Sequence, residues 1–552
     1  MKSARNTTPD LDAVIVGAGF SGLCMLYRLR QIGMCARVFE TAPDVGGTWY
    51  WNRYPGARVD VESLEYSFSF SEELQQEWSW SERYAPQPEL LRYANHVADR
   101  FDLRRDIQLE TRVTSALYDE SANVWVVTTD RGERVTARYC IMGTGILSAP
   151  KPPEIPGLET FAGERYHTAM WPQEAVDFAG KRVGVIGTGS SGVQCIPIIA
   201  EQASHLTVFQ RTPVYSVPAR NRPMNRDLER AVKADYAALR QMERESFAGF
   251  VMVNDKPSPA SMVSALAVSA EERKRVYDEC WKSGGLCFYF AFADLFLDMD
   301  ANNTVAEYLA DKIRERVHDP VIAEKLVPSG FPFGAKRLCA DTNYYETYNR
   351  DNVTLVDVRE TPIDAVTPRG VIVGGREIAL DVLVTATGFD AVTGAMSKIE
   401  IRGRDGVTFN ERNADGPRSM LGIMNAGFPN FFTIGGALST SALTQSIVSI
   451  EYHTQWIADA ISHTEKSGRA RIEPTAEAED AWVKLVNATV SFTLFPRANS
   501  WYMGANVPGK PRRVLTYVAP FAEYRRQCDE IAAKGYEGFV FGAAAPKVRA
   551  TV

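Results

Sequence analysis

The chain has 552 residues, of which 45% are hydrophobic and 23% are charged, so it is long enough for two or three globular domains. Its formal net charge of -7 argues against nucleic acid as a partner, because a surface that binds phosphates needs a basic excess. No apolar run approaches the length of a membrane span, and residues 1–12 do not resemble a signal peptide. We therefore expect a soluble, cytoplasmic protein, a monomer or weak homo-oligomer, with no membrane or nucleic-acid partner.

The cysteines and histidines exclude two further kinds of chemistry. The eight cysteines are scattered and form no Cys-x-x-Cys pair, so most should be small buried hydrophobic residues rather than a redox-active dithiol. The six histidines show none of the spacings typical of zinc sites. We expect no metal.

The first chemical signal lies near the N-terminus. An apolar strand at 13–16 enters the turn Gly17-Ala18-Gly19-Phe20-Ser21-Gly22, and a helical pattern follows at 23–31. This order is typical of a Rossmann-like dinucleotide site, in which backbone N–H groups at the start of the helix receive a pyrophosphate. Glu40 stands 21 residues after Gly19, where a carboxylate accepts hydrogen bonds from ribose hydroxyls. The first site therefore suits FAD.

A second copy of the same pattern follows the strand 183–186. Its turn is Gly187-Thr188-Gly189-Ser190-Ser191-Gly192, again followed by a helical pattern. The position equivalent to Glu40 is Gln210, and Arg211 and Thr212 come next. A carboxylate there would repel a 2′-phosphate, whereas an arginine and a hydroxyl bind one. The second site therefore suits NADPH.

Other segments complete the expected architecture. The stretches 141–145 and 383–388 look alike, each a strand that ends in a turn of small residues. Between about 218 and 330 the pattern is mainly helical, with apolar residues at helical spacing from Leu228 to Leu239. Within that stretch Ser269 and Glu272 form a capping pair for a helix that ends at Gly284, and a loop is expected near 249–260. We expect an α/β protein with two Rossmann-like domains and a helical insertion in the second.

Two dinucleotides in one chain imply hydride transfer from NADPH to a flavin. The reduced flavin has three possible fates: to reduce a disulfide, to pass electrons to a protein partner or quinone, or to react with O2 and hold a flavin peroxide for an organic substrate. The first needs the cysteine pair that this chain lacks. The other two stay open at this stage.

The segment between the two glycine turns favours the oxygen chemistry. Phe161, Gly163, His167 and Trp171, followed by Pro172, match the fingerprint Phe-x-Gly-x-x-x-His-x-x-x-Trp. The chain here resembles the Baeyer–Villiger flavin monooxygenases, and most closely their phenylacetone and steroid subgroup. The related enzymes that oxygenate amines or sulfides usually carry Phe or Tyr in place of Trp171. The resemblance implies a linker that couples the two domains, in which His167 and Trp171 take no part in the chemistry.

The resemblance extends over nearly the whole chain and implies roles for three more segments. Residues 46–60, with Gly47, Trp49 and Asp60, look like the family's flavin-covering segment. Residues 333–337 look like its catalytic loop. The third segment, 501–510, looks like its mobile C-terminal segment.

The catalytic roles also follow from the resemblance. Arg337 would stabilise the peroxide anion and its adduct with a ketone, and Asp60 would hold Arg337. Lys336 would join Arg211 in binding the 2′-phosphate, and Trp501 would close over cofactor and substrate. The product would be an ester or lactone.

A division of the chain is implied as well. The FAD domain would comprise 1–147 and 385–552, and the NADPH domain 148–217 and 331–384, with the helical insertion at 218–330. One departure concerns the substrate-side loop, where the family often reads Gly-Pro-x-Ser-Pro and this chain has Gly436-Ala437-Leu438-Ser439-Thr440. Loss of both prolines changes the stiffness of that loop and bears on substrate range. Two other functions remain: oxygenation of amine or sulfide heteroatoms, and reduction of a protein acceptor.

Overall fold

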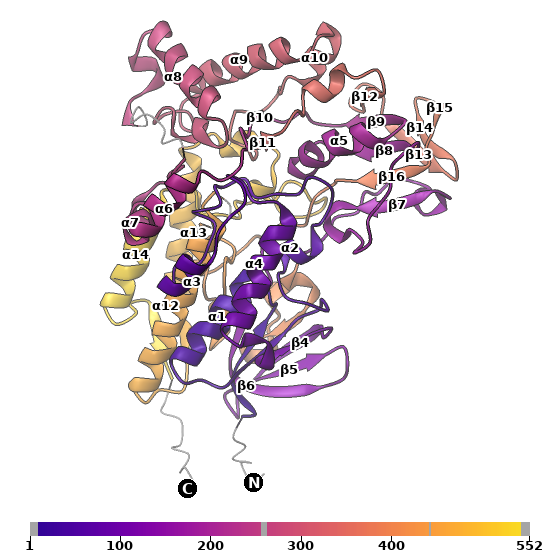
Figure 1. The fold of residues 1–552 in the computed structure, drawn as a ribbon. Coiled ribbons are helices and arrows are strands. Elements are labelled where there is room, and N and C mark those ends of the chain that lie inside the picture. Colours follow the sequence, from indigo (N-terminus) through magenta and orange to yellow (C-terminus); the bar gives the residue numbers. More distant parts are fainter. Residues whose placement is uncertain (1–8, 255–261, 441–442, 543–552) are drawn as a thin grey trace.

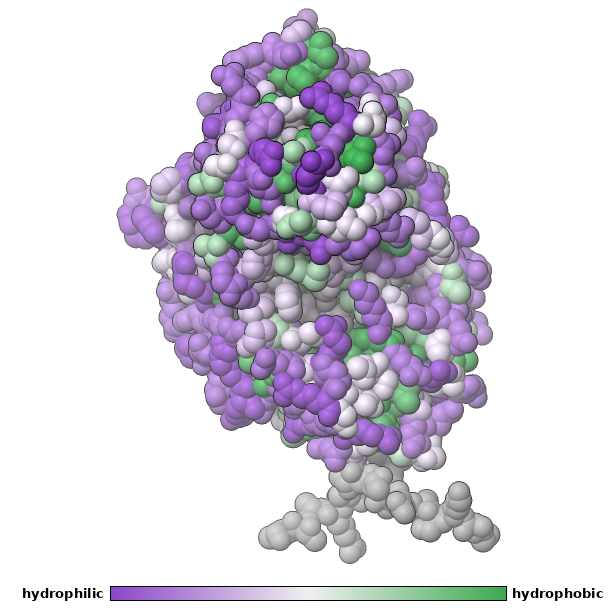
Figure 2. Space-filling model, turned by 90° about the vertical axis from the view of Figure 1, so that its right-hand side faces the viewer, coloured by the Kyte–Doolittle hydropathy of each residue, from purple (hydrophilic) through white to green (hydrophobic). Residues whose placement is uncertain are grey.

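The computed structural model describes residues 9–254, 262–440 and 443–542 (Figure 1). Two sheets of largely parallel strands lie in different parts of the molecule, with helices packed around each, and further helices form a layer at the top of the view. The α/β fold with two Rossmann-like cores is as predicted. Figure 2 shows that hydrophilic residues cover most of one face, which is hollowed near its middle.

The first sheet combines strands from both ends of the chain. Its order is β17-β4-β5-β6-β1-β2-β3, with β18 also paired to β6. The pairs of β1 with β2 and β6, of β2 with β3 and of β18 with β6 are parallel, so those strands direct their carboxyl ends to one edge. The bounds are β1 Leu11–Val16, β2 Ala36–Phe39, β3 Ile107–Gln108, β4 Val113–Asp119, β5 Val124–Thr129, β6 Arg134–Met142, β17 Glu400–Arg402 and β18 Phe431–Thr433.

Helices from both ends of the chain pack beside this sheet. Helix α1 (Phe20–Gln31) lies against α12 (Ser446–Lys466). The helix predicted from residue 23 begins three residues earlier, because the backbone becomes helical directly after Gly19. The other helices are α2 Thr48–Trp51, α3 Glu72–Glu77, α4 Gln87–Arg100, α11 Phe409–Arg412, α13 Ala476–Ser491 and α14 Phe521–Ala533.

The second sheet is entirely parallel, with the order β12-β9-β8-β16-β7. Its strands are β7 Glu164–His167, β8 Arg182–Ile186, β9 His205–Gln210, β12 Val353–Asp357 and β16 Val382–Thr385. Helix α5 (Ser190–Gln202) connects β8 to β9. Three smaller sheets contain the pair β10 Ser216–Pro218 and β11 Cys339–Asp341, the antiparallel set β13 Ile363–Thr367, β14 Gly370–Val373 and β15 Arg376–Ala379, and the pair β19 Ile472–Pro474 and β20 Phe539–Phe541.

The mainly helical stretch lies between β10 and β11. Its helices are α6 Arg226–Ala234, α7 Tyr236–Glu245, α8 Ala270–Ser283, α9 Met299–Arg316 and α10 Pro320–Leu326. Figure 1 shows α8, α9 and α10 along the top, whereas α6 and α7 lie lower, on the side of α13 and α14. Tyr236 donates a hydrogen bond to the carbonyl of Leu64, so α7 contacts the irregular segment that precedes α3.

Two details of this stretch differ from the sequence prediction. The helical pattern from Leu228 to Leu239 forms two helices rather than one, because Asp235 leaves the helical conformation and its side chain caps α7. The second detail is the capping of α8: Ser269 accepts a hydrogen bond from the Glu272 N–H and the helix ends at Gly284, as predicted, but the Glu272 carboxylate pairs with Arg275 instead of closing the predicted capping pair. Of the predicted loop, residues 249–254 are irregular and 255–261 lie outside the described residues.

The chain crosses between the two sheets twice, and the crossings run side by side. Pro150 and Phe389 form an antiparallel bridge. Lys151 N–H donates to the Gly388 carbonyl at 2.9 Å, and Asp390 N–H donates to the Ala149 carbonyl at 2.9 Å. The segments that follow the two similar turns of small residues therefore run together in one connection. Within the described ranges, no helix is long and apolar enough to cross a bilayer.

Candidate active site

The first glycine turn is fixed by close backbone contacts. Gly17 has φ +102°, and a Cβ there would lie 2.6 Å from the Gly143 carbonyl oxygen. Gly47 has φ +53°, and a Cβ there would lie 2.8 Å from the Cα of Gly19. Larger residues would therefore clash with main chain at these positions. The Gly46 N–H also donates to the Ala18 carbonyl at 3.0 Å, so the predicted flavin-covering segment lies directly against the turn.

Glu40 lies at the carboxyl end of β2 beside this turn. Its Oε2 accepts from the Ala18 N–H at 2.6 Å and its Oε1 from the Ala42 N–H at 2.8 Å. Burial raises the pKa of Glu40, against the lowering effect of these hydrogen bonds. Each carboxylate oxygen can accept a further bond, and no side chain caps α1 at Gly19. The residues thus fit a ribose hydroxyl pair and a pyrophosphate, as FAD requires.

Trp49 lies in α2, two residues after Gly47. Its side chain is buried, and its indole N–H donates to the hydroxyl of Tyr66 at 3.3 Å. The carbonyl of Trp49 accepts a bond from the side-chain amide of Gln87. Trp49 is therefore anchored at both its side chain and its backbone.

The second glycine turn shares part of this geometry. Gly187 has φ +109°, and a Cβ there would lie 2.5 Å from the Ala386 carbonyl oxygen. Gly192 would also clash with the Gly187 carbonyl if it carried a Cβ. No heavy atom lies within 4 Å of a Cβ built on Gly189. The hydroxyl of Thr188 donates to the Thr212 carbonyl at 2.9 Å and so fixes the segment that follows β9.

The last residue of β9 and the two residues after it differ in their contacts. Gln210 is buried, and its amide donates to the Lys325 carbonyl at 2.8 Å, which ties β9 to α10. Arg211 is exposed and Thr212 is half-buried. No carboxylate of the described chain forms an ion pair with Arg211, and α5 has no side-chain cap. This combination suits a phosphate monoester and a pyrophosphate.

Arg211 acts electrostatically on two lysines, Lys336 and Lys151. The predicted residue Lys336 has its pKa lowered by burial and then by the charge of Arg211. Lys151, in the first crossing, has its pKa lowered by the same two causes in the same order. Among the residues described, none of the three forms an ion pair with a carboxylate. Sequence reasoning missed Lys151, because a lysine in a proline-rich linker carries no distinguishing pattern.

Arg337 and Asp60 form an ion pair between segments 277 residues apart. Asp60 Oδ2 accepts from Arg337 Nε at 3.0 Å and from a terminal guanidinium nitrogen at 2.7 Å. Burial acts to lower the pKa of Arg337, but Asp60, with smaller contributions from Tyr289 and Tyr502, raises it overall. Arg337 therefore holds a fixed positive charge in a largely buried setting.

The helical stretch holds the loop that carries Arg337. The Phe333 N–H donates to the side-chain carbonyl of Asn302 in α9 at 2.9 Å, and the amide of Asn302 donates back to the Phe333 carbonyl at 3.0 Å. On the other side of Arg337, the Leu338 N–H donates to the hydroxyl of Tyr289 at 3.1 Å. These anchors come from segments far away in sequence, and no short pattern could have indicated them.

The predicted C-terminal segment lies on the two crossings. Trp501 is half-buried, its ring 4.4 Å from that of the fully buried Tyr502. The side-chain amide of Asn506 donates to the Phe389 carbonyl at 2.8 Å. Tyr502 contributes to the electrostatic environment of Arg337, and Trp501 precedes it in the chain.

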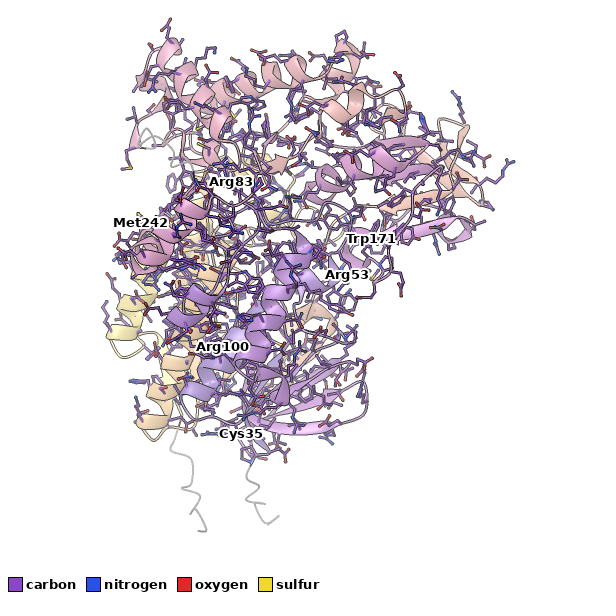
Figure 3. All side chains as sticks on the ribbon, viewed as in Figure 1. Cys35, Arg53, Arg83, Arg100, Trp171 and Met242 are labelled. Carbon is purple, nitrogen blue, oxygen red and sulfur yellow. The ribbon has the colours of Figure 1, made fainter. Side chains whose placement is uncertain are left out.

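The fingerprint residues lie at the domain connection rather than with Arg337. His167 accepts from the Ala169 N–H through Nδ1 at 3.0 Å, and its Nε2 faces the Lys151 carbonyl at 3.4 Å. Figure 3 places Trp171 near Arg53. Gln173, two residues further on, lies beside the hydroxyl of Tyr50. These contacts join the two sides of the molecule.

The cysteines are mostly buried, as predicted. Only Cys35 is exposed, and Figure 3 shows it at the far end of the first sheet from Arg53 and Trp171. Cys280 and Cys287 contact each other, with 2.9 Å between their sulfur atoms, which the sequence spacing did not indicate. Their contact raises the pKa of Cys280, so its thiolate is disfavoured. No cluster of potential metal ligands occurs among the residues described.

Two largely parallel sheets, each with a glycine turn opening a helix, define a flavoprotein oxidoreductase with two dinucleotide sites. A family model described as pyridine nucleotide-disulphide oxidoreductase matches residues 14–243. A Baeyer-Villiger monooxygenase from Pseudooceanicola batsensis is 44% identical to this chain, in an alignment that covers 99% of this chain and 99% of the relative. A phenazine N-monooxygenase from Lysobacter antibioticus is 42% identical, and that alignment covers 97% of this chain and 98% of the relative. A solved structure of an oxidized steroid monooxygenase bound to NADP is 50% identical, with a TM-score of 0.92, covering 97% of this chain and 100% of that one.

The chain belongs to the Baeyer–Villiger monooxygenase family. It is an FAD-dependent enzyme that uses NADPH, as the sequence predicted. The reaction of this family inserts one oxygen atom beside a ketone carbonyl and gives an ester or lactone.

Proposed function

We propose that this chain oxygenates a small ketone at a site formed around Arg337, with Asp60 as its charge partner. The observation that carries this assignment is the Asp60–Arg337 ion pair, held at 2.7 and 3.0 Å. Asp60 is the last residue of the flavin-covering segment, and Arg337 lies near the second turn, because Cys339 contacts Ser190 at 3.4 Å. The charge therefore stands between the two nucleotide sites.

The FAD site is assigned to the first turn and its walls. Backbone N–H groups after Gly17, Gly19 and Gly22 would receive the pyrophosphate, and Glu40 would accept from the ribose hydroxyls. Gly47 and Trp49 would cover the flavin from the side that lies against Gly19. When bound, the flavin supplies a hydride acceptor and then the site at which O2 is activated.

NADPH is assigned to the second turn. Gly187, Thr188, Gly189 and Gly192 would form its pyrophosphate cradle. The 2′-phosphate would be bound by three residues, Arg211, Thr212 and Lys336. Trp501, carried on the segment that lies over the two crossings, would exclude water from the reacting groups.

Arg337 would act on the substrate through its charge. Attack on a ketone carbonyl places negative charge on the carbonyl oxygen, and a preorganised cation in a dry site stabilises that charge. A guanidinium is suited to this, because it stays protonated where burial lowers the pKa of a lysine, as it does for Lys336. Asp60 would fix the direction of the guanidinium, which makes it a positioning residue.

We also propose the division of the chain given by the sequence: an FAD domain at 1–147 and 385–552, and an NADPH domain at 148–217 and 331–384, with the insertion at 218–330. It is supported by β17 and β18 sharing the first sheet, and by β12 and β16 sharing the second. We propose further that the enzyme is cytoplasmic and acts as a monomer or weak homo-oligomer on small ketones, without nucleic acid as a partner.

A second candidate function is oxygenation of a ring nitrogen. It is favoured by the 42% identity with the phenazine N-monooxygenase, which covers nearly the full length of both chains. A nitrogen nucleophile develops no carbonyl oxyanion, so this reaction has less need of Arg337. The remaining alternative is transfer of electrons to a protein acceptor, which would give no oxygenated product.

Product analysis distinguishes these functions. The purified enzyme would be supplied with NADPH, O2 and a panel of linear, aryl, cyclic and steroidal ketones, together with aromatic amines and sulfides. Mass spectrometry should find an ester or lactone from at least one ketone. N- or S-oxides alone, or NADPH consumption without any oxygenated product, would contradict the proposal.

A further inference from the structure

The chain that leads to Asp60 packs into two hydrophobic cores in succession. Tyr54 and Ala57 are buried in the core of the second sheet, together with apolar residues of α5. Val59 and Val61 are buried in the core that contains α1 and one face of the first sheet. Asp60 therefore lies just beyond the point where the chain passes from one core into the other.

Gln194 of α5 holds this part of the chain by hydrogen bonds. Its Oε1 accepts from the Tyr54 hydroxyl at 2.8 Å, and its Nε2 donates to the Arg58 carbonyl at 3.1 Å. Its main chain is equally close, because a Cβ built on Gly56 would lie 2.4 Å from the Gln194 carbonyl oxygen. An amide suits this position, since it carries both an acceptor and a donor.

Ser190, the first residue of α5, contacts the support of the other member of the ion pair. Its hydroxyl oxygen lies 3.4 Å from the sulfur of Cys339, and that sulfur lies 3.7 Å from the main-chain oxygen of Arg337. Ser190 and Gln194 are four residues apart, so they lie on one face of the helix. A single face of α5 therefore contacts the segments that carry Arg337 and Asp60.

The ion pair depends on how these two segments are placed. The bonds between Asp60 and Arg337, at 2.7 and 3.0 Å, form only when both segments are held in position. A preorganised charge must stay within about 0.5 Å of its working position to act at full strength. The hydrogen bonds of Gln194 supply a fixed point two residues before Asp60.

We propose that Gln194 is a positioning residue for oxygen insertion: it ties the helix that opens the second nucleotide site to the chain that carries Asp60, and Asp60 directs the guanidinium of Arg337. This inference rests on the proposed function, in which that guanidinium stabilises charge on the carbonyl oxygen of the substrate. Because the amide is bonded to Tyr54 and Arg58, its loss should misplace the charge and leave the glycine turn of the nucleotide site in place.

The test uses FAD-loaded Gln194→Met, because methionine has a similar length and lacks both hydrogen-bonding groups of the amide. With NADPH, O2 and a ketone that the unmodified enzyme converts, the ratio of ester to hydrogen peroxide should fall at least about fivefold, since a misplaced charge stabilises the oxygenated adduct less. The dissociation constant of NADP+ and the rate of flavin reduction should change by less than about twofold.

A double-mutant cycle shows whether Gln194 acts through Asp60. In an Asp60→Ala background there is no carboxylate to place, so adding Gln194→Met should change the ratio by less than about twofold. A general loss of packing would lower the ratio in both backgrounds. Urea unfolding of each variant measures that loss separately.

Two further variants serve as controls. Gln202→Met makes the same change on an exposed side chain at the end of α5 and should keep the unmodified ratio. Tyr54→Phe removes one of the two bonds and leaves the amide bonded to the Arg58 carbonyl, so it should fold normally and lower the ratio about twofold. It therefore tests the same connection even if Gln194→Met fails to fold.

The outcomes that overturn the inference are distinct. An unmodified ratio in Gln194→Met, or in Tyr54→Phe if the first variant cannot be purified, would contradict it. So would an equal fall with and without the carboxylate of Asp60, since Gln194 would then serve stability alone. If Arg337→Ala itself keeps the unmodified ratio, the proposed function is wrong and so is this inference. A fall in Arg337→Ala without one in Gln194→Met refutes only the role of Gln194.

Discussion

The two glycine turns share a sequence pattern but differ in what surrounds them. A Cβ on Gly19 would meet the Cα of Gly47 at 3.4 Å, whereas a Cβ on Gly189 would meet no heavy atom within 4 Å. The residue directly after β2, beside the first turn, is the buried Glu40. The residue directly after β9, beside the second turn, is the exposed Arg211. The first turn is enclosed by the chain's own backbone, and the second is open and positively charged.

This difference matches the proposed assignment of FAD to the first turn and NADPH to the second. A flavin that serves in every turnover benefits from an enclosed site, which slows its dissociation. A nicotinamide cofactor must leave and be replaced, and an open site lined with cations favours rapid association of an anionic ligand. The same pattern of glycines therefore supports a resident cofactor in one domain and an exchanging one in the other.

The strongest test of this comparison is a pair of identical substitutions. Gly19→Val should prevent formation of the yellow holoenzyme, because the Cβ of residue 19 already lies 3.4 Å from the Cα of Gly47 and the side chain extends beyond it. Gly189→Val is the matched change in the second turn; its Cβ meets no heavy atom within 4 Å, so it should fold with a full complement of FAD, though it should bind NADPH less well. Flavin absorbance per protein measures both. Equal flavin content in the two variants would contradict the comparison.

A second prediction concerns acid stability on the FAD side. His453 is fully buried in α12, where its Nδ1 accepts from the Gly435 N–H at 3.0 Å and its Nε2–H faces the Tyr524 oxygen at 2.8 Å. Burial lowers the pKa of His453 to about 3, from about 6.5 when unfolded. The neutral form thus contributes stability above pH 6.5 that is lost as the pH falls toward 3.

Between pH 6.5 and 5.0 this loss should amount to about 1.6 kcal/mol. The free energy of unfolding, measured with urea and followed by flavin fluorescence, should therefore fall more steeply with decreasing pH in the unmodified enzyme than in His453→Gln. The control is His205→Gln in the second sheet, which should keep the unmodified slope. The same slope in all three proteins would show that His453 does not titrate in this way.

The third and smallest prediction tests the open site. Arg211→Ala should lower kcat/KM for NADPH at least tenfold, about 1.4 kcal/mol, and change the value for NADH little. The reason is that only NADPH carries the phosphate that the guanidinium would bind. Steady-state kinetics with both nucleotides gives the answer. An equal loss of kcat/KM with NADPH and NADH would contradict the assignment of the 2′-phosphate to Arg211.

The sequence predicted those features that short patterns determine. Each glycine turn needs its strand, its helix and its positive φ within a few residues, so both were found with nearly correct bounds. The adjacency of Asp60 and Arg337 followed from family resemblance, since nothing local connects residues 277 apart. The roles of the site residues and the domain boundaries stay predictions.

Other features depend on tertiary contacts that no pattern records. The anchoring of the Arg337 loop by Asn302 and Tyr289 arises only when the insertion packs against it. The contacts of Lys151 with Gly388 and Thr387 arise only because two crossings far apart in sequence run side by side. The break at Asp235 was missed because the apolar spacing continues through it, while the capping of α7 by its carboxylate ends the preceding helix.

The central claim is that Arg337 serves the oxygen-insertion step rather than flavin reduction. The most direct measurement follows both half-reactions of Arg337→Ala, using rapid-mixing spectroscopy of the flavin together with ester and hydrogen peroxide yields from a ketone. The variant should bind FAD, be reduced by NADPH within about tenfold of the unmodified rate, and release hydrogen peroxide. Its ester formation should fall by at least about a hundredfold, roughly 3 kcal/mol, with a smaller loss in Asp60→Ala. Near-normal ester yield from Arg337→Ala would contradict the assignment.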